Sequence, residues 1–114
     1  MHDDLIERLE KATGPDREID TAIEELFDPS FRDSTLRQAT RYTASLDAAV
    51  ALVEKMLPGW ACGFDAGSKT SIAFVDPHDF ADRFLGARYT AQAATPAIAL
   101  LIALLRALSN RERG

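Results

Sequence analysis

The chain has 114 residues, of which 46% are hydrophobic and 27% are charged, and its 13 basic and 18 acidic residues give a net charge of -5. This length predicts one domain spanning residues 1–114, and the composition excludes an intrinsically disordered chain. The acidic balance argues against nucleic acid as a partner, because binding to a phosphate backbone needs basic side chains.

The sequence indicates a cytoplasmic protein. Cys62 is the only cysteine, so no intramolecular disulfide is expected. The first residues, Met1 to Asp4, are acidic, and the apolar stretch of a signal peptide does not follow them. The longest apolar stretch, Ala93 to Leu105, is shorter than the roughly 20 residues that cross a bilayer. We therefore expect no membrane span and no membrane partner.

The chain begins with two expected helices. Apolar residues at helical spacing predict one helix over Asp4–Ala12 and a second over Pro15–Phe27. Gly14 between them suits the end of a helix, whereas Pro15 suits the first position of the next one. We expect residues 1–28 to form an N-terminal helical hairpin and residues 29–41 to form a connecting loop.

The middle of the chain predicts a helix followed by a β-hairpin. Apolar residues at helical spacing cover Leu46–Leu57, and Ser45 before them is a favourable N-cap. Large side chains alternate with small ones in Trp60–Phe64, and β-branched and aromatic residues occur in Thr70–Val75. Between these two strands, Asp65–Ser68 has the composition of a turn.

A third strand and a last helix complete the expected fold. The strand is expected at Ala87–Ala91, and the helix at Ala97–Leu108, with Thr95 as N-cap and Pro96 in the first helical position. We expect residues 42–110 to form an α-β-β-β-α unit in which both helices pack on a three-stranded antiparallel sheet. The fold class is therefore α+β.

The last helix is apolar on nearly every side. No polar side chain interrupts Ala97–Leu105, which is longer than two helical turns. A sheet covers one face of a helix, and each large aliphatic side chain left exposed elsewhere would forfeit about 1.5–3 kcal/mol. Either the N-terminal helical hairpin or a second copy of the chain must cover the other face. The second alternative predicts a homo-oligomer whose interface comprises Leu100, Leu101, Leu104 and Leu108.

No metal site, cofactor or catalytic site is expected. Acidic residues in the second helix are spaced as on a solvated helix face, unlike the ligands of a cation-binding loop. They are Asp16, Glu18, Asp20, Glu24, Glu25 and Asp28. The histidines, His2 and His78, lack companions at the spacing of zinc ligands. His78 could act as an acid-base group with Asp76 and Asp79, but the sequence Asp-Pro-His-Asp is typical of a turn.

The best candidate for a ligand site comprises two helix starts. Free backbone N–H groups and the helix dipole favour anions there, so two converging starts could bind a phosphate or carboxylate. An arginine near each start would add positive charge. Ordinary capping is the alternative explanation for the hydroxyl residues. The candidate ligand-binding residues are Arg41, Tyr42, Thr43, Ser45, Arg88 and Thr95.

Trp60 and Cys62 allow two interpretations each. Trp60 could stack on a base of a ligand or anchor a partner, or it could close the core beneath the third helix. Cys62 could be a nucleophile, but no basic residue beside it in the sequence would lower its pKa. We therefore include Trp60 among the candidate ligand-binding residues and expect Cys62 to be a buried structural thiol.

Four segments together resemble small phage and prophage proteins of alphaproteobacteria, similar to the phage α/β/α-sandwich domain family. The segments are Leu9–Asp20, Tyr42–Ala49, Pro58–Trp60 and Ala94–Leu100. The resemblance covers nearly the whole chain except Phe31–Thr40 and Asp76–Gly86. These motifs are structural in character, and the resemblance implies no catalytic residues. The apolar-rich stretch Val50–Leu57 departs from the expected pattern.

The order helix, three strands, helix is also similar to double-stranded-RNA-binding domains. Those domains hold phosphates with lysines at the start of the last helix. Here that position reads Ala94-Thr95-Pro96-Ala97, which contains no lysine. The similarity is therefore limited to topology.

The resemblance implies a phage protein that acts inside a bacterial host cell. The leading hypothesis is a non-enzymatic binding protein in counter-defence, which inhibits a host defence protein or sequesters a nucleotide-like small molecule at the helix starts. A second hypothesis is a structural or assembly accessory protein that acts through homo-oligomerisation. A third is a hydrolase that uses His78 and the neighbouring aspartates.

Overall fold

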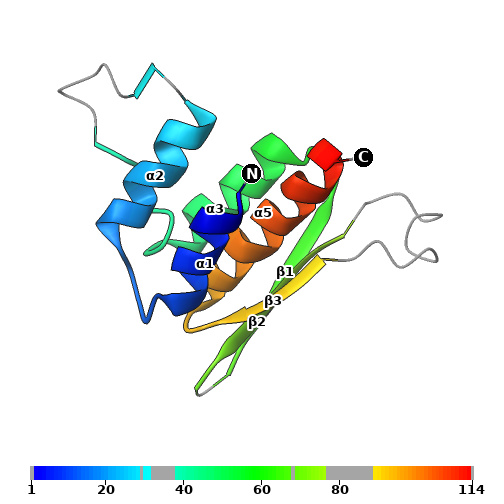
Figure 1. Ribbon diagram of the computed structural model, residues 1–114. Helices are drawn as coiled ribbons and strands as arrows, with labels where there is room; N and C mark the ends of the chain where they lie inside the picture. The colour runs from blue at the N-terminus through cyan, green and yellow to red at the C-terminus, as the bar shows by residue number, and fades with distance from the viewer. Residues whose placement is uncertain (1, 29, 32–37, 68, 77–88, 114) are drawn as a thin grey trace.

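The computed structural model describes residues 2–28, 30–31, 38–67, 69–76 and 89–113. Its elements follow the order expected from the sequence, with three helices, three antiparallel strands and a C-terminal helix (Figure 1). The α+β prediction is therefore confirmed. The elements are α1 (Asp3–Lys11), α2 (Arg17–Phe27), α3 (Leu46–Met56), β1 (Ala61–Ala66), β2 (Ser71–Asp76), β3 (Tyr89–Ala93) and α5 (Pro96–Arg113).

The three strands form a sheet in the order β1-β2-β3, with every pair antiparallel. The register places Ala73 of β2 opposite Phe64 of β1 and Ala91 of β3. Because side chains alternate between the faces of a sheet, Ala73, Val75 and Ala91 share the face that α5 covers. Ile72 points to the opposite face and is exposed.

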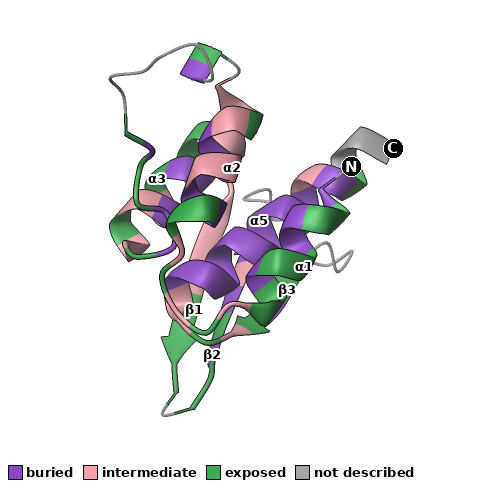
Figure 2. Cartoon of the chain, turned by 60° about the vertical axis from the view of Figure 1, so that its left-hand side comes forward, coloured by how far each residue is buried: buried purple, intermediate pink, exposed green. Residues whose placement is uncertain are grey.

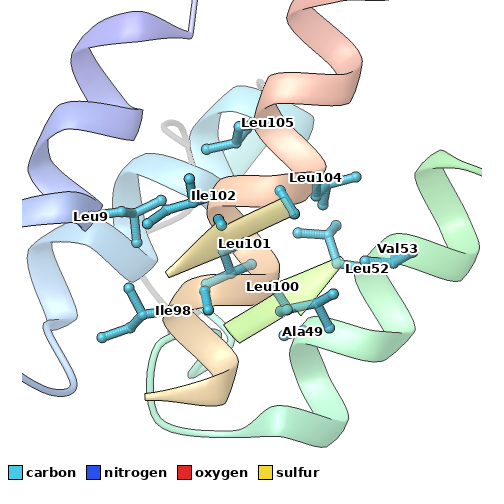
Figure 3. Close-up of a cluster of buried hydrophobic side chains, with 14 of the residues drawn as sticks. Leu9, Ala49, Leu52, Val53, Ile98, Leu100, Leu101, Ile102, Leu104 and Leu105 are labelled. Carbon is cyan, nitrogen blue, oxygen red and sulfur yellow. The ribbon is translucent and has the colours of Figure 1, made fainter. Parts of the chain in front are cut away.

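Helix α5 is the centre of the fold. It contacts all three strands on one side and α1 and α3 on the other (Figure 1). Figure 3 shows Leu100 and Leu104 pointing toward Val53 and its neighbours on α3, whereas Ile98 and Ile102 point toward α1. The expectation that the third helix lies on the sheet is therefore corrected, because α3 packs mainly against α5.

The apolar surface of α5 is buried within a single chain. Every residue from Ala97 to Leu105 is at most 5% exposed, and Figure 2 shows this part of the helix as buried. Leu100, Leu101 and Leu104 are therefore not accessible to a second copy of the chain. The prediction that they form a homo-oligomer interface is corrected. Leu108, the fourth of these residues, is half-buried. Helices α1 and α3 of the same chain cover the face of α5 that points away from the sheet.

The ends of the helices follow local side-chain chemistry. Helix α2 begins at Arg17 instead of Pro15, because the Asp16 carboxylate caps it and accepts bonds from two backbone N–H groups. Helix α5 begins at Pro96 as expected but continues to Arg113, beyond the expected end at Leu108. Within the described ranges, none of the helices combines the length and apolar character needed to cross a membrane.

Candidate functional site

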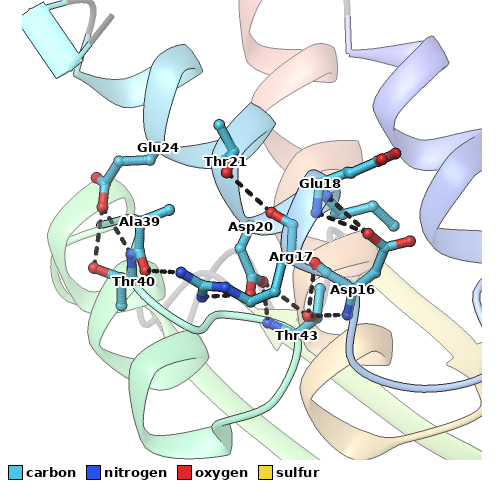
Figure 4. A network of polar contacts seen from close by, with 10 residues as sticks. Asp16, Arg17, Glu18, Asp20, Thr21, Glu24, Ala39, Thr40 and Thr43 are labelled. Atoms are coloured by element: carbon cyan, nitrogen blue, oxygen red, sulfur yellow. Dashed lines mark hydrogen bonds and ion pairs between the residues drawn. The ribbon is translucent and has the colours of Figure 1, made fainter. Parts of the chain in front are cut away.

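A buried polar junction joins α2 to the segment before α3 (Figure 4). The side chain of Asp20 is completely buried. Its Oδ1 atom accepts hydrogen bonds from the backbone N–H and from the hydroxyl of Thr43, both at 2.8 Å. Its Oδ2 atom forms an ion pair with Arg17 Nη1 at 3.0 Å. A buried carboxylate is costly unless its oxygens are bonded, and these three contacts satisfy that requirement.

A second buried carboxylate, that of Glu24, lies one helical turn further along α2. Its Oε1 atom accepts bonds from the backbone N–H of Thr40 at 3.1 Å and from the Thr40 hydroxyl at 3.0 Å. The Tyr42 hydroxyl donates to Glu24 Oε2 at 3.4 Å. Burial raises the pKa of Tyr42, the Thr40 hydroxyl opposes this shift, and the Glu24 charge adds to it. The phenol therefore stays neutral over the physiological range.

Thr43 is the central residue of the junction. Its Oγ1 atom accepts a bond from the Asp16 backbone N–H at 2.8 Å and lies 2.8 Å from Asp20 Oδ1 and 3.2 Å from the Asp16 carbonyl. A hydroxyl has one proton, so the shorter contact to the Asp20 carboxylate takes it. Arg17 adds a bond from Nη2 to the Ala39 carbonyl at 3.0 Å. Together these contacts fix the position of α2 along the segment that leads into α3.

This junction corrects the expectation of a solvated acidic face for Asp20 and Glu24, whereas Glu18 is exposed as expected. Asp20 is 0% and Glu24 8% exposed, and Asp16 acts as the cap. Asp20 and Glu24 directly follow the buried Ile19 and Ile23 with the same spacing of four, but this local pattern does not show that Thr40 and Thr43 bond to them. Within the described ranges, no three His, Cys, Asp or Glu side chains lie close enough to hold a metal ion.

The structure places the candidate ligand-binding residues in different environments. Tyr42 and Thr43 are buried, with their hydroxyls bonded to carboxylates, so neither presents its hydroxyl to solvent. The hydroxyls of Ser45 and Thr95 each accept a bond from a backbone N–H of their own helix at 3.2 Å. Capping therefore uses both hydroxyls. Arg41 is exposed at the turn before α3.

Helices α3 and α5 run side by side in the same direction, so their starts lie at the same end of the molecule (Figures 1 and 3). This agrees with the convergence considered from the sequence. The buried carboxylates of Asp20 and Glu24 lie next to the segment that leads into α3, however, and negative charge there opposes an anion. Arg88, the second predicted cation, lies outside the described residues.

Trp60 packs against the core and against another aromatic residue. Its ring stacks on Tyr89 with a centroid separation of 6.2 Å and an interplanar angle of 25°, and the Tyr89 hydroxyl accepts a bond from Asn110. Cys62 is half-buried, where the expectation was full burial, and desolvation followed by the Glu54 charge raises the pKa of its thiol. His78 and Asp79 lie outside the described residues, so the acid-base hypothesis stays a prediction.

The face of the sheet opposite α5 is exposed near the β1–β2 turn, whereas Asp76 at the other end of β2 is buried. Ile72, near the start of the middle strand, is 43% exposed, and Thr90 and Gln92 are exposed beside it on β3. Phe74 lies across Gly63 so closely that a Cβ atom on Gly63 would be 2.6 Å from the ring. A shallow hollow of about 390 Å³ adjoins this face, lined by Glu10, Ile72, Thr90, Ala91, Gln92 and Arg106. Sequence reasoning did not identify this surface, because alternation predicts two faces without showing which one a helix covers.

Comparisons of the chain with protein-family models, with curated proteins and with solved structures found no match. The chemistry and geometry of the open sheet face and the buried junction are therefore the basis for any assignment of function.

Proposed function

We propose that this chain is a non-enzymatic binding protein that occludes a surface of a protein partner with the open face of its sheet. The observation that carries the proposal is the exposure of Ile72, which is 43% exposed on the middle strand of that face. A large aliphatic side chain at this position forfeits burial energy in the free chain and recovers it when a partner covers the sheet. The resemblance to phage proteins supports a role in counter-defence, with a host defence protein as the partner.

The charges around Ile72 indicate which kind of partner surface would bind this face. Asp65 is exposed on this face beside Ile72, where the described strands carry no lysine or arginine, and the whole chain has a net charge of -5. Asp76 shares the face but is 2% exposed, so it is not available to a partner. Electrostatic complementarity favours a partner with an apolar patch bordered by basic side chains. Arg106 extends over the edge of β3, but its Nη2 atom forms an ion pair with Glu10 at 3.0 Å, so the two charges offset each other.

Protein occlusion is better supported than sequestration of a nucleotide-like signal. Sequestration at the helix starts would use their free backbone N–H groups, and the Ser45 and Thr95 hydroxyls already accept a bond from one of these groups in each helix. It would also need the hydroxyl of Thr43, which is bonded to Asp20. A panel of cyclic and linear nucleotides is therefore expected to leave the melting temperature unchanged.

An infection assay tests the proposal. The chain is expressed in bacterial hosts that each carry one defence system, and each host is challenged with a phage that its system blocks. We expect the wild type to restore plaque formation in at least one host, and Ile72→Glu to abolish this effect because it buries a charge in the contact. Leu26→Glu is the matched control, because Leu26 is 39% exposed on α2, outside the sheet.

Circular dichroism confirms that both variants are folded before the assay. Full activity of folded Ile72→Glu would contradict the proposal, as would equal loss of activity in both variants. Restoration by neither the wild type nor the control across the panel of hosts would contradict the counter-defence role itself.

A further inference from the structure

We propose that the outer edge of β1 pairs with the same edge of a second copy, so that two chains form a symmetric dimer with one continuous antiparallel sheet. The edge is Ala61–Ala66, which contains no proline and no lysine to discourage pairing. The inference is independent of the proposed function, because it uses the edge of the sheet and leaves the open face unchanged.

The hairpin turn shows which backbone groups of β1 point outward. The Gly67 N–H donates to the Thr70 carbonyl at 3.0 Å, so Gly67 and Thr70 form a hydrogen-bonded pair. Such pairs alternate with non-bonded pairs along an antiparallel ladder. Counting back from Gly67, the backbone groups of Cys62, Phe64 and Ala66 point away from β2 and can bond to a further strand.

The same alternation of hydrogen-bonded and non-bonded pairs, applied to β3 at the other edge of the sheet, agrees with a hydrogen bond to Thr90. It predicts that the backbone groups of Thr90 on β3 point outward, and the Thr90 carbonyl accepts a bond from Arg106 Nη1 at 2.9 Å. Arg106 is held in place by Glu10 of α1, which also contacts β3. This edge is therefore occupied by a charged side chain from the same chain, which protects an edge against pairing. The described residues supply no equivalent cover for the edge of β1.

The side chains of β1 are complementary to a second copy of themselves. Pairing about a two-fold axis at Phe64 places the two Phe64 side chains directly opposite each other. In the single chain this side chain is 49% exposed. Asp65 then faces Gly63 of the second copy, so the register brings no like charges into direct opposition. The dimer would bury Phe64, the most exposed large hydrophobic side chain among the described residues, and satisfy the outward backbone groups of β1.

Cross-linking tests the register. In this dimer residue 66 lies opposite Cys62 of the second copy in a hydrogen-bonded pair, with Cα atoms about 5.5 Å apart. That distance suits a disulfide, whereas residues 62 and 66 of one strand are about 13 Å apart. We expect Ala66→Cys to form a covalent dimer when diamide oxidises the paired thiols, and the control Leu26→Cys to stay monomeric on a non-reducing gel.

Solution mass tests the edge itself. Sedimentation in 0.3 M salt, which screens the repulsion between two acidic chains, should show a dimer for the wild type and for Leu26→Lys. Phe64→Lys should be monomeric, because it places like charges opposite each other, and Ala66→Pro should be monomeric because it removes an outward N–H. A wild type that is monomeric at all concentrations would overturn the proposal. A dimer that persists in both edge variants, or equal cross-linking of the two cysteine variants, would overturn it as well.

Discussion

Helices α5 and α2 are attached to the rest of the fold by different forces. Apolar side chains surround α5 from Ala97 to Leu105, and the sheet, α1 and α3 cover them. By contrast, α2 buries Ile19 and Ile23 together with the carboxylates of Asp20 and Glu24. Apolar burial is strong but non-directional, whereas hydrogen bonds to a buried carboxylate require one geometry. The comparison indicates that α5 supplies most of the stability and that the polar junction specifies where α2 lies.

The largest effect is expected in the centre of α5. Leu104→Ala removes a fully buried side chain between α5 and α3 and should lower the free energy of unfolding by about 2–5 kcal/mol. Urea denaturation measures this change as a lower midpoint with an unchanged slope. A loss below about 1 kcal/mol would show that Leu104 is not in a closely packed core.

The next effect is expected at the junction. Asp20→Ala leaves the Thr43 N–H without its acceptor and removes the nearer acceptor of the Thr43 hydroxyl, so it should cost about 2–4 kcal/mol. Arg17 is half-exposed and can turn to solvent, which limits the cost. Thr43→Val and the double variant complete a double-mutant cycle with Asp20→Ala. We expect a coupling energy between residues 20 and 43 that is clearly different from zero. Additive losses in urea denaturation would contradict the direct contact.

A smaller effect is expected at the helix caps. Ser45→Ala and Thr95→Ala should each lower the free energy of unfolding by about 0.5–2 kcal/mol, because each removes an acceptor for a backbone N–H. Ser45→Asp is the matched control and should retain the stability. If Ser45→Ala left the thermal midpoint unchanged, its hydroxyl would be free for another role, and the candidate ligand site would regain support.

The smallest effect concerns alkaline pH. Burial raises the pKa of Tyr42 above its usual value of 10.0, so the folded chain favours the neutral phenol. The stability linked to this group is fully present below pH 10 and is lost as the pH rises through the higher pKa of the folded state. Tyr42→Phe should flatten the decline of stability above pH 10. Identical pH profiles of the variant and the wild type would contradict this assignment.

Element order could be predicted from the sequence because it follows from local periodicity and caps. Ser45, Thr95 and Pro96 mark helix starts where the structure has them. The third strand is at Tyr89–Ala93, two residues after the expected position, because few local signals mark its start. The uninterrupted apolar stretch Ala97–Leu105 likewise predicted that Leu104 is buried, but it contains no information about which element covers it.

The buried junction could not be predicted, because its partners are far apart in the sequence. Asp20 bonds to Thr43, and Glu24 to Thr40, across more than a dozen intervening residues. A carboxylate on an acidic helix has the same local pattern whether solvent or a buried hydroxyl satisfies it. The open face around Ile72 was missed for a related reason, since only the packing of α5 decides which face of the sheet is covered.

Native-state hydrogen exchange tests the contrast between α2 and α5 most directly. We expect the amides of α5 to exchange only through global unfolding and those of α2 to exchange through a local opening of lower free energy. Leu104→Ala should then lower the exchange free energy of α5 by about 2–5 kcal/mol and leave that of α2 unchanged as long as local opening remains the easier route. Equal exchange free energies in the two helices, lowered equally by Leu104→Ala, would contradict the account.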